Sequence, residues 1–326
     1  MGKAHGSRHG SMQFWPRKLA KRVYGRVKSW PKQKEAGLLG FSGYKAGMTQ
    51  ALIVDNRKAS VTKGQQIAVP VTVIECPPIK IASSRFYKKT INGLKVISEV
   101  YAEKTDKELS RKIPAPKKAK KKIDNIKDFD DIRINVYTQP KLTGIGRKKP
   151  ELYELGLGGS KDDKLKFVKE NLGKEVKVSD IFKAGDQLDM HCVTKGKGYQ
   201  GPVKRFGVQI RSHKAEKTKR GVGSLGGWRA QQHVMPRVPH AGKMGFHTRT
   251  EYNKLILKIG NKPEEINPKD GFLNYGLVKN DYLLIKGSVA GPKNRIVRIV
   301  KSIRPNKLMP KDAPSIQWIN LESKQG

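Results

Sequence analysis

Short apolar runs, each bounded by polar or turn residues, recur along the chain and predict β-strands. Residues 50–55 (QALIVD) and 66–76 (QIAVPVTVIEC) are rich in β-branched side chains, as buried strands are. Residues 132–139, 187–194, 254–260, 281–290 and 295–303 have the same character. Pro70 interrupts the second run, and because proline cannot donate a ladder hydrogen bond, it predicts an edge strand or a bulge.

One segment carries a helical pattern. In residues 160–173 (SKDDKLKFVKENLG), Leu165, Val168 and Leu172 fall on one helical face. Ser160 and Asp163 resemble a capping box, and Gly173 can end the helix. Several short strands with this one helix predict a mainly β fold, a small β-barrel that carries an α+β insertion.

Residues 195–254 interrupt the strands with sixty positions that show no periodicity. They contain fourteen Lys and Arg residues, ten glycines and two acidic residues, Glu216 and Glu251. A loop of this length inside a compact domain is acceptable only where another macromolecule holds it. The segment therefore predicts a basic, Gly-rich extension, or finger.

Composition divides the rest of the chain. Residues 1–34 contain ten Lys and Arg residues, no acidic residue and too few aliphatic residues for a core, which predicts an extended basic arm that orders on RNA. Residues 84–176 form the predicted insertion. The predicted barrel is discontinuous and combines residues 35–83, 177–194 and 255–326.

Charge indicates the kind of partner. The chain has 68 Lys+Arg against 28 Asp+Glu, a formal net charge of +40 over 326 residues. Nucleic acid offers the dense negative charge that relieves such self-repulsion. A membrane partner would need a basic amphipathic helix or a lipid anchor, and neither is visible. With no apolar span, no signal peptide and only Cys76 and Cys192, the chain is predicted to be cytoplasmic.

The main enzyme motif is G-x-G-x-x-G at Gly196, Gly198 and Gly201, directly after a predicted strand. A dinucleotide site needs a helix that opens at the third glycine within a βαβ unit. Pro202, Gly207 and the charged residues that follow argue against that helix. The favoured interpretation is a Gly-rich turn whose amides approach phosphates. A dinucleotide-dependent or RNA-modifying enzyme remains a minor alternative.

Metal and nucleophile patterns are weak. His233, His240 and His247 are spaced by seven, but intervening prolines and glycines exclude a continuous helix, and no C-x-x-C or H-E-x-x-H occurs. No G-x-S-x-G occurs either. We therefore expect no metal, no cofactor, no catalytic residue and no small-molecule substrate.

Aromatic residues in basic surroundings favour RNA. Trp228 lies among glycines and arginine without apolar neighbours, which predicts stacking on a base, or alternatively packing on loop backbone. Tyr199, Phe206 and Phe246 show this pattern more weakly. The basic run 111–122 is either an RNA contact or a solvated face. The predicted RNA contacts are Trp15, Arg17, Arg22, Arg26, Lys195, Lys197, Lys204, Arg205, Arg211, Lys217, Lys219, Arg220, Trp228, Arg229, His233, Arg237, His240, Lys243, His247 and Arg249.

Several motifs in order resemble the ribosomal protein L3 family, and the long insertion and the N-terminal arm resemble its archaeal and eukaryotic form rather than the shorter bacterial one. The motifs are residues 41–50 (FSGYKAGMTQ), 193–207 (VTKGKGYQGPVKRFG), 226–228 (GGW), 233–235 (HVM), 241–245 (AGKMG), 247–253 (HTRTEYN), 287–293 (GSVAGPK) and 323–325 (SKQ). The resemblance implies a six-stranded, translation-protein-type β-barrel with a long extension, here residues 195–254. It implies a tip tryptophan, here Trp228, near the peptidyl transferase centre.

The same resemblance implies a structural constituent of the large ribosomal subunit that acts early in assembly. Its expected partners are large-subunit (23S) ribosomal RNA and neighbouring ribosomal proteins. Eukaryotic members carry a modifiable histidine before the tip tryptophan, and Lys219 stands at that position here. The alternative function is an architectural DNA-binding protein, which charge alone permits. Such a protein more typically shows a helix-turn-helix, a basic heptad region or a minor-groove wedge, and none is visible.

Overall fold

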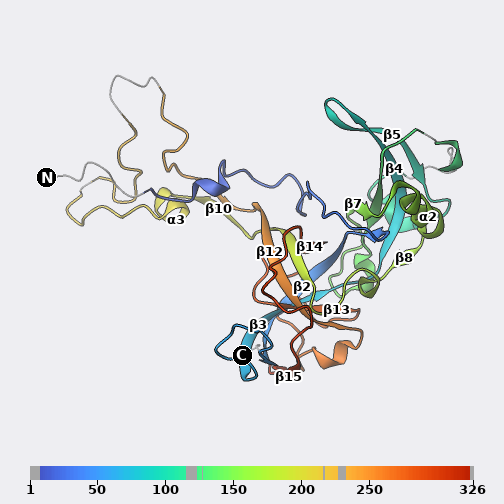
Figure 1. The fold of residues 1–326 in the computed structure, drawn as a ribbon. Helices are drawn as coiled ribbons and strands as arrows, with labels where there is room; N and C mark the ends of the chain where they lie inside the picture. Colours follow the sequence, from blue (N-terminus) through green and yellow to red (C-terminus); the bar gives the residue numbers. More distant parts are fainter. Residues whose placement is uncertain (1–7, 115–122, 127, 216, 227–232, 324–326) are drawn as a thin grey trace. The chain divides into compact units, whose positions relative to one another are not determined.

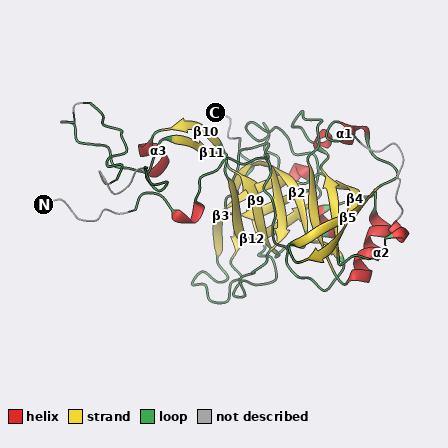
Figure 2. Ribbon diagram, turned by 90° about the horizontal axis from the view of Figure 1, so that it is seen from above, coloured by secondary structure: helices red, strands yellow, loops and turns green. Residues whose placement is uncertain are grey.

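A computed structural model of the chain describes residues 8–114, 123–126, 128–215, 217–226 and 233–323. The chain divides into two compact units. Unit 1 combines Met1–Arg22 with Val193–Thr248, and unit 2 combines Val23–Cys192 with Arg249–Gly326. The elements are mostly strands, with a few short helices (Figures 1 and 2). The fold is therefore mainly β, as the short apolar runs predicted.

The larger sheet of unit 2 is antiparallel and has the order β14-β9-β12-β13-β3-β2-β15, with an additional pairing between β14 and β2. Its strands are β2 (Gly40–Val54), β3 (Gln66–Glu75), β9 (Gln187–Val193), β12 (Thr248–Gly260), β13 (Tyr282–Lys286), β14 (Ile296–Lys301) and β15 (Ile316–Ile319). Each contains or overlaps a run predicted from the sequence, except β15. The sequence pattern therefore located most of the sheet.

A second antiparallel sheet has the order β1-β7-β6-β4-β5, and β8 also pairs with β4. Its strands are β1 (Gly37–Leu38), β4 (Ile79–Thr90), β5 (Gly93–Tyr101), β6 (Asp131–Tyr137), β7 (Leu152–Gly158) and β8 (Glu175–Val176). The helices of unit 2 are α1 (Lys107–Ser110), α2 (Lys161–Asn171) and the 3₁₀ turns Ile123–Asn125, Pro140–Leu142, Val178–Asp180 and Pro263–Glu265.

The predicted helix is confirmed as α2. Ser160 accepts a hydrogen bond from the Asp163 amide while the Asp163 carboxylate accepts from the Ser160 amide, which completes the capping box. Val168 is buried, and Leu165 packs beside it against the core. The helix ends before Gly173, whose φ is 84°. Local sequence signals sufficed here because caps and spacing act within a few residues.

The edge prediction from Pro70 is wrong for β3 as a whole, which lies between β2 and β13, but it holds locally, since residues 66–70 have register partners in β2 and none in β13. The register of β3 with β13 runs from Glu75 to Val71 and stops before Pro70. The Pro70 carbonyl still accepts a hydrogen bond from Gly287 at 2.8 Å, just past the end of β13. The missing N–H therefore falls where no ladder bond is needed.

One apolar core joins the two sheets of unit 2 and includes Phe41, Phe86 and Tyr282. The Tyr44 hydroxyl, from β2, donates to Thr138 Oγ1 beyond β6, at 2.9 Å. Cys192 is buried in this core, as expected for a small apolar side chain. The two sheets thus form one packed body within unit 2.

The expectation that residues 1–34 lack core residues is wrong for their second half. Tyr24 is buried in the core of unit 2, and its hydroxyl donates to the Leu152 carbonyl at 2.8 Å. Trp30 packs against the same core, at the surface that Gly156 leaves open. Arg298 donates to the carbonyls of Gly25 and Glu154, so it ties this segment to β7. Aromatic side chains spaced along an irregular segment give no periodic signal.

Unit 1 contains a two-stranded antiparallel sheet of β10 (Gly196–Gln200) and β11 (Gly242–Gly245). A short helix, α3 (Pro202–Phe206), follows β10, and the 3₁₀ turn Met12–Phe14 lies in the N-terminal segment. The expectation of a turn without a helix after Gly201 is therefore wrong. Proline is well suited to the first helical position, and Gly207, with φ of 71°, ends the helix. No dinucleotide fingerprint results, since β10 and β11 are antiparallel.

Candidate nucleic-acid interface

The N-terminal segment packs on α3 within unit 1. Phe206 is buried, although a base-stacking role was expected for it. The Arg17 guanidinium lies 4.1 Å from the Phe206 ring centroid, and Trp15 meets the ring edge-on at 6.3 Å. Arg17 Nη1 also donates to the Arg205 carbonyl at 2.6 Å. Arg17 and Trp15 therefore hold the unit together through contacts that local spacing cannot reveal.

His247 closes the base of the same unit. It is buried, its Nδ1 lies 2.7 Å from the Lys18 carbonyl oxygen, and its amide donates to Thr194 Oγ1. The Thr194 amide donates back to the His247 carbonyl at 3.0 Å. These bonds join the two ends of the segment between β9 and β12 to each other. The burial of His247 favours a structural role for its ring.

Most other predicted contacts in unit 1 are exposed cations or histidines. They are Arg22, Lys195, Lys197, Lys204, Arg211, Lys217, Lys219, Arg220, His233, Arg237, His240 and Lys243. Arg205 is half-buried and donates to the His240 carbonyl at 2.9 Å, across from α3 to the segment before β11. The fold thus gathers side chains up to more than two hundred positions apart in sequence.

Sequence reasoning missed further exposed cations of unit 1, namely Arg8, Lys18, Lys21 and Lys214. Arg8 donates to the Arg237 carbonyl at 3.0 Å, and its guanidinium lies 5.6 Å from the Trp15 ring. The same charge density that marked their neighbours was the available signal. By sequence, unit 1 contains eighteen Lys and Arg residues and one acidic residue, Glu216. Its field is strongly positive whatever the details of the contacts.

Four predicted contacts differ from this set. Arg26 is exposed but belongs to unit 2, as does Arg249. Arg249 is half-buried, and burial lowers the pKa of its guanidinium. Trp228 and Arg229 lie outside the described residues. Of the aromatic candidates, Tyr199 on β10 is 73% exposed and remains available for stacking.

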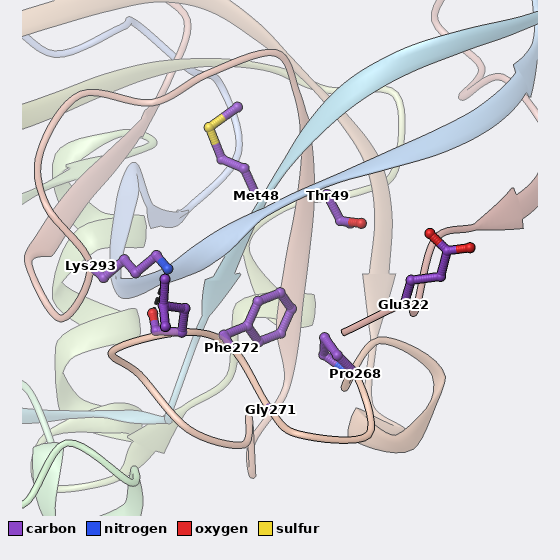
Figure 3. Close-up of a pocket in the computed structure, with 8 residues that line it drawn as sticks. Met48, Thr49, Pro268, Gly271, Phe272, Lys293 and Glu322 are labelled. Carbon is purple, nitrogen blue, oxygen red and sulfur yellow. Dashed lines mark hydrogen bonds between the residues drawn. The ribbon is translucent and has the colours of Figure 1, made fainter. Parts of the chain in front are cut away.

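The described residues show no group of three or more His, Cys, Asp or Glu side chains that could hold a metal ion. None of the described helices is long and apolar enough to cross a membrane. A cavity of about 90 Å³ lies in unit 2 between β2 and the loop of Phe272, with Lys293 and Glu322 as its charged lining residues (Figure 3).

The comparisons with known proteins agree with the charge and the sequence motifs. The family model described as "Ribosomal protein L3" matches residues 1–125 and 117–326. The chain belongs to the ribosomal protein L3 family. The resemblance seen in the sequence motifs is therefore confirmed.

Archaeal members of the L3 family match this chain over 97–100% of their length. The large ribosomal subunit protein uL3 of Methanothermobacter thermautotrophicus is 47% identical over 338 residues, which cover 100% of both chains. The protein of the same name from Methanobrevibacter smithii is 48% identical over 337 residues, again with 100% of both covered. That of Methanococcus vannielii is 47% identical over 98% of this chain and 97% of its own.

Membership of the L3 family makes the chain a structural ribosomal protein rather than an enzyme.

Proposed function

We propose that this L3-family chain is a structural component of the large ribosomal subunit in the cytoplasm, where unit 1 binds large-subunit (23S) ribosomal RNA. The observation that carries the proposal is the charge of unit 1, eighteen Lys and Arg residues against one acidic residue. The name of the archaeal relatives, large ribosomal subunit protein uL3, supports the choice of subunit.

The binding energy comes from phosphate neutralisation. Each cation that contacts a phosphate releases condensed counterions, so affinity falls steeply with salt, by a log–log slope of about 0.7–0.9 per contact. Arg17 and His247 serve this surface indirectly, because their internal bonds fix the backbone from which the exposed cations project. Tyr199 adds an exposed ring for base stacking.

Unit 2 supplies the anchor. The finger, residues 195–254, starts after β9 and returns in β12, and these strands are neighbours in the larger sheet. We propose that β14, β9, β12, β13, β3 and β2 close into a six-stranded barrel of the translation-protein type, with β14–β2 as the closing pair. Residues 84–176 are the insertion in this proposal.

We propose further that the finger braces RNA near the peptidyl transferase centre, with Trp228 at its tip, and that the chain supports subunit assembly. Trp228→Ala is expected to leave unit 2 folded while it alters ribosome function. If the substitution instead lowers the thermal stability of unit 2, Trp228 is a core residue and this part of the proposal fails.

Co-sedimentation tests the main proposal. A tagged full-length chain, expressed in cells that assemble it into ribosomes, is expected to sediment with the large-subunit peak. High salt is expected to remove it from that peak. Recovery only in free fractions, with intact ribosomal RNA, contradicts it. Competition with duplex DNA separates the architectural alternative, since a DNA-binding protein would be displaced from structured RNA by equal concentrations of duplex.

A further inference from the structure

The hairpin of β4 and β5 extends past the sheet that supports it (Figure 1). The register of β4 with β6 ends at the pair Tyr87–Asp131. From Lys88 to Thr90, β4 pairs only with β5 among the described residues. Residues 88–95 are thus a two-stranded ribbon, and together with the adjoining Val96 and Ile97 they are here called the hairpin tip. Such ribbons are marginal in water unless another surface packs on them.

The hairpin tip exposes aliphatic side chains. Leu94, Val96 and Ile97 are 43–45% exposed, and Ile91 is fully exposed. Ile91 occupies the two-residue turn between Thr90 and Gly93, where Gly, Asn, Asp, Ser and Pro usually predominate. None of these four side chains belongs to the apolar clusters of the described core. Exposed aliphatic side chains gathered on one hairpin are a feature of interaction sites.

The charge of the hairpin tip is one-sided. It carries Lys88, Lys89 and Lys95 and no acidic residue. Lys88 forms an ion pair with Asp128 at the base of the ribbon, whereas Lys89 and Lys95 are exposed.

The outer strand of the hairpin tip, β5, contains a bulge. Ile97 has no register partner in β4, because the pairing of the two strands shifts between Phe86 and Tyr87. A bulge and a lysine on an outer strand discourage strand addition, so the surface acts through its side chains.

We propose that the hairpin tip docks on a second protein that offers an apolar pocket bordered by carboxylates. The aliphatic side chains fill the pocket, and Lys89 and Lys95 meet the acidic rim. RNA fits less well, because aliphatic side chains lack the π-face that stacks on bases and phosphates cannot bury them. This docking goes beyond RNA binding by unit 1. It rests on the proposed function only because the large subunit is the sample in which the partner protein is sought.

Site-specific photo-crosslinking tests the proposal in the full chain. A benzophenone amino acid replaces Ile91, and a matched chain carries it instead of Val61, a fully exposed apolar residue in the β2–β3 loop. Position 91 is expected to yield one protein adduct whose crosslinked peptide is apolar and contains Asp or Glu. Position 61 is expected to yield none. With Leu94→Ser or with Lys89→Glu/Lys95→Glu, adduct yield should fall about tenfold, the effect of losing one buried apolar contact or its charge partner.

Protein and RNA adducts are measured in every gradient fraction that contains the chain. An RNA adduct at position 91, equal protein adducts at 91 and 61, or no protein adduct in any fraction overturns the proposal. Loss of the chain from the large-subunit peak contradicts the proposed function alone. An unchanged adduct yield in both charge and aliphatic variants also overturns the docking chemistry.

Discussion

Arg298 on β14 and His191 on β9 are register partners in the larger sheet, and both side chains are buried. Burial, followed by the Arg298 charge, lowers the pKa of His191 to about 4. His191 Nδ1 lies 2.9 Å from Thr250 Oγ1, a partner that suits the neutral ring. Two adjacent basic residues inside one sheet therefore coexist with only one of them charged near neutral pH.

This pairing makes stability depend on pH. Because the folded pKa of His191 lies below its ordinary value of 6.5, the unfolded chain binds the proton more tightly. The contribution of His191 to the free energy of unfolding is therefore fully present above pH 6.5 and is lost as the pH falls toward 4. The free energy of unfolding decreases by about 3 kcal/mol over this range. His191→Gln should lack this component. Urea unfolding at pH 7.5, 5.5 and 4.5 measures it, and parallel pH profiles for both chains would contradict it.

Arg17 is expected to act through the fold of unit 1 rather than through its charge alone. Arg17→Ala removes a cation–π contact with Phe206, worth about 0.5–2 kcal/mol, and the bond to the Arg205 carbonyl. Amide hydrogen exchange in α3 should accelerate several-fold. Lys18→Ala removes the same charge from an exposed side chain and should leave that exchange unchanged. Equal exchange in both variants would show that Arg17 does not hold α3.

Position 245 on β11 requires glycine, because the backbone of Lys195 packs closely against it. Its φ is 74°, and an added Cβ would lie 2.0 Å from the Lys195 carbonyl oxygen. Gly198 has a similar φ of 69°, but nothing lies within 4 Å of its Cβ position. Gly198→Ala should cost about 1 kcal/mol from backbone strain alone. Gly245→Ala should abolish protection of β10 amides and weaken RNA binding, and equal effects of the two substitutions would refute the packing argument.

Salt dependence reports the phosphate contacts of unit 1. Replacing Lys217, Lys219 and Arg220 by alanine should reduce the slope of log K against log salt by about 2–3, because each lost contact removes roughly 0.7–0.9. The matched control replaces Lys58, Lys63 and Lys104, three exposed lysines of unit 2. Filter binding to large-subunit ribosomal RNA measures both. Equal slopes for the two triple variants would place the RNA surface elsewhere.

The sequence by itself determined the parts of the molecule that depend on near neighbours. Alternating and β-branched runs predicted strands such as β9 and β14, and Ser160 with Asp163 predicted the start of α2. Charge density indicated the basic surface, because composition alone decides net charge. Pro70 indicated an edge correctly only at its own position, since β3 is internal and the neighbouring β13 ends before Pro70.

Only the tertiary structure decided which cations build the fold and which face solvent. Arg17 and Arg205 are 188 positions apart, yet they are joined by a hydrogen bond, and Arg17 also lies over the buried ring of Phe206. His247 contacts the Lys18 carbonyl, 229 positions away in sequence. Tyr24 is buried in the core, although the sequence pattern around it does not predict a core residue. Periodicity records only residues within a few positions of one another. Contacts between distant segments arise from strand order, so the same residue types become structural or exposed only once the chain has folded.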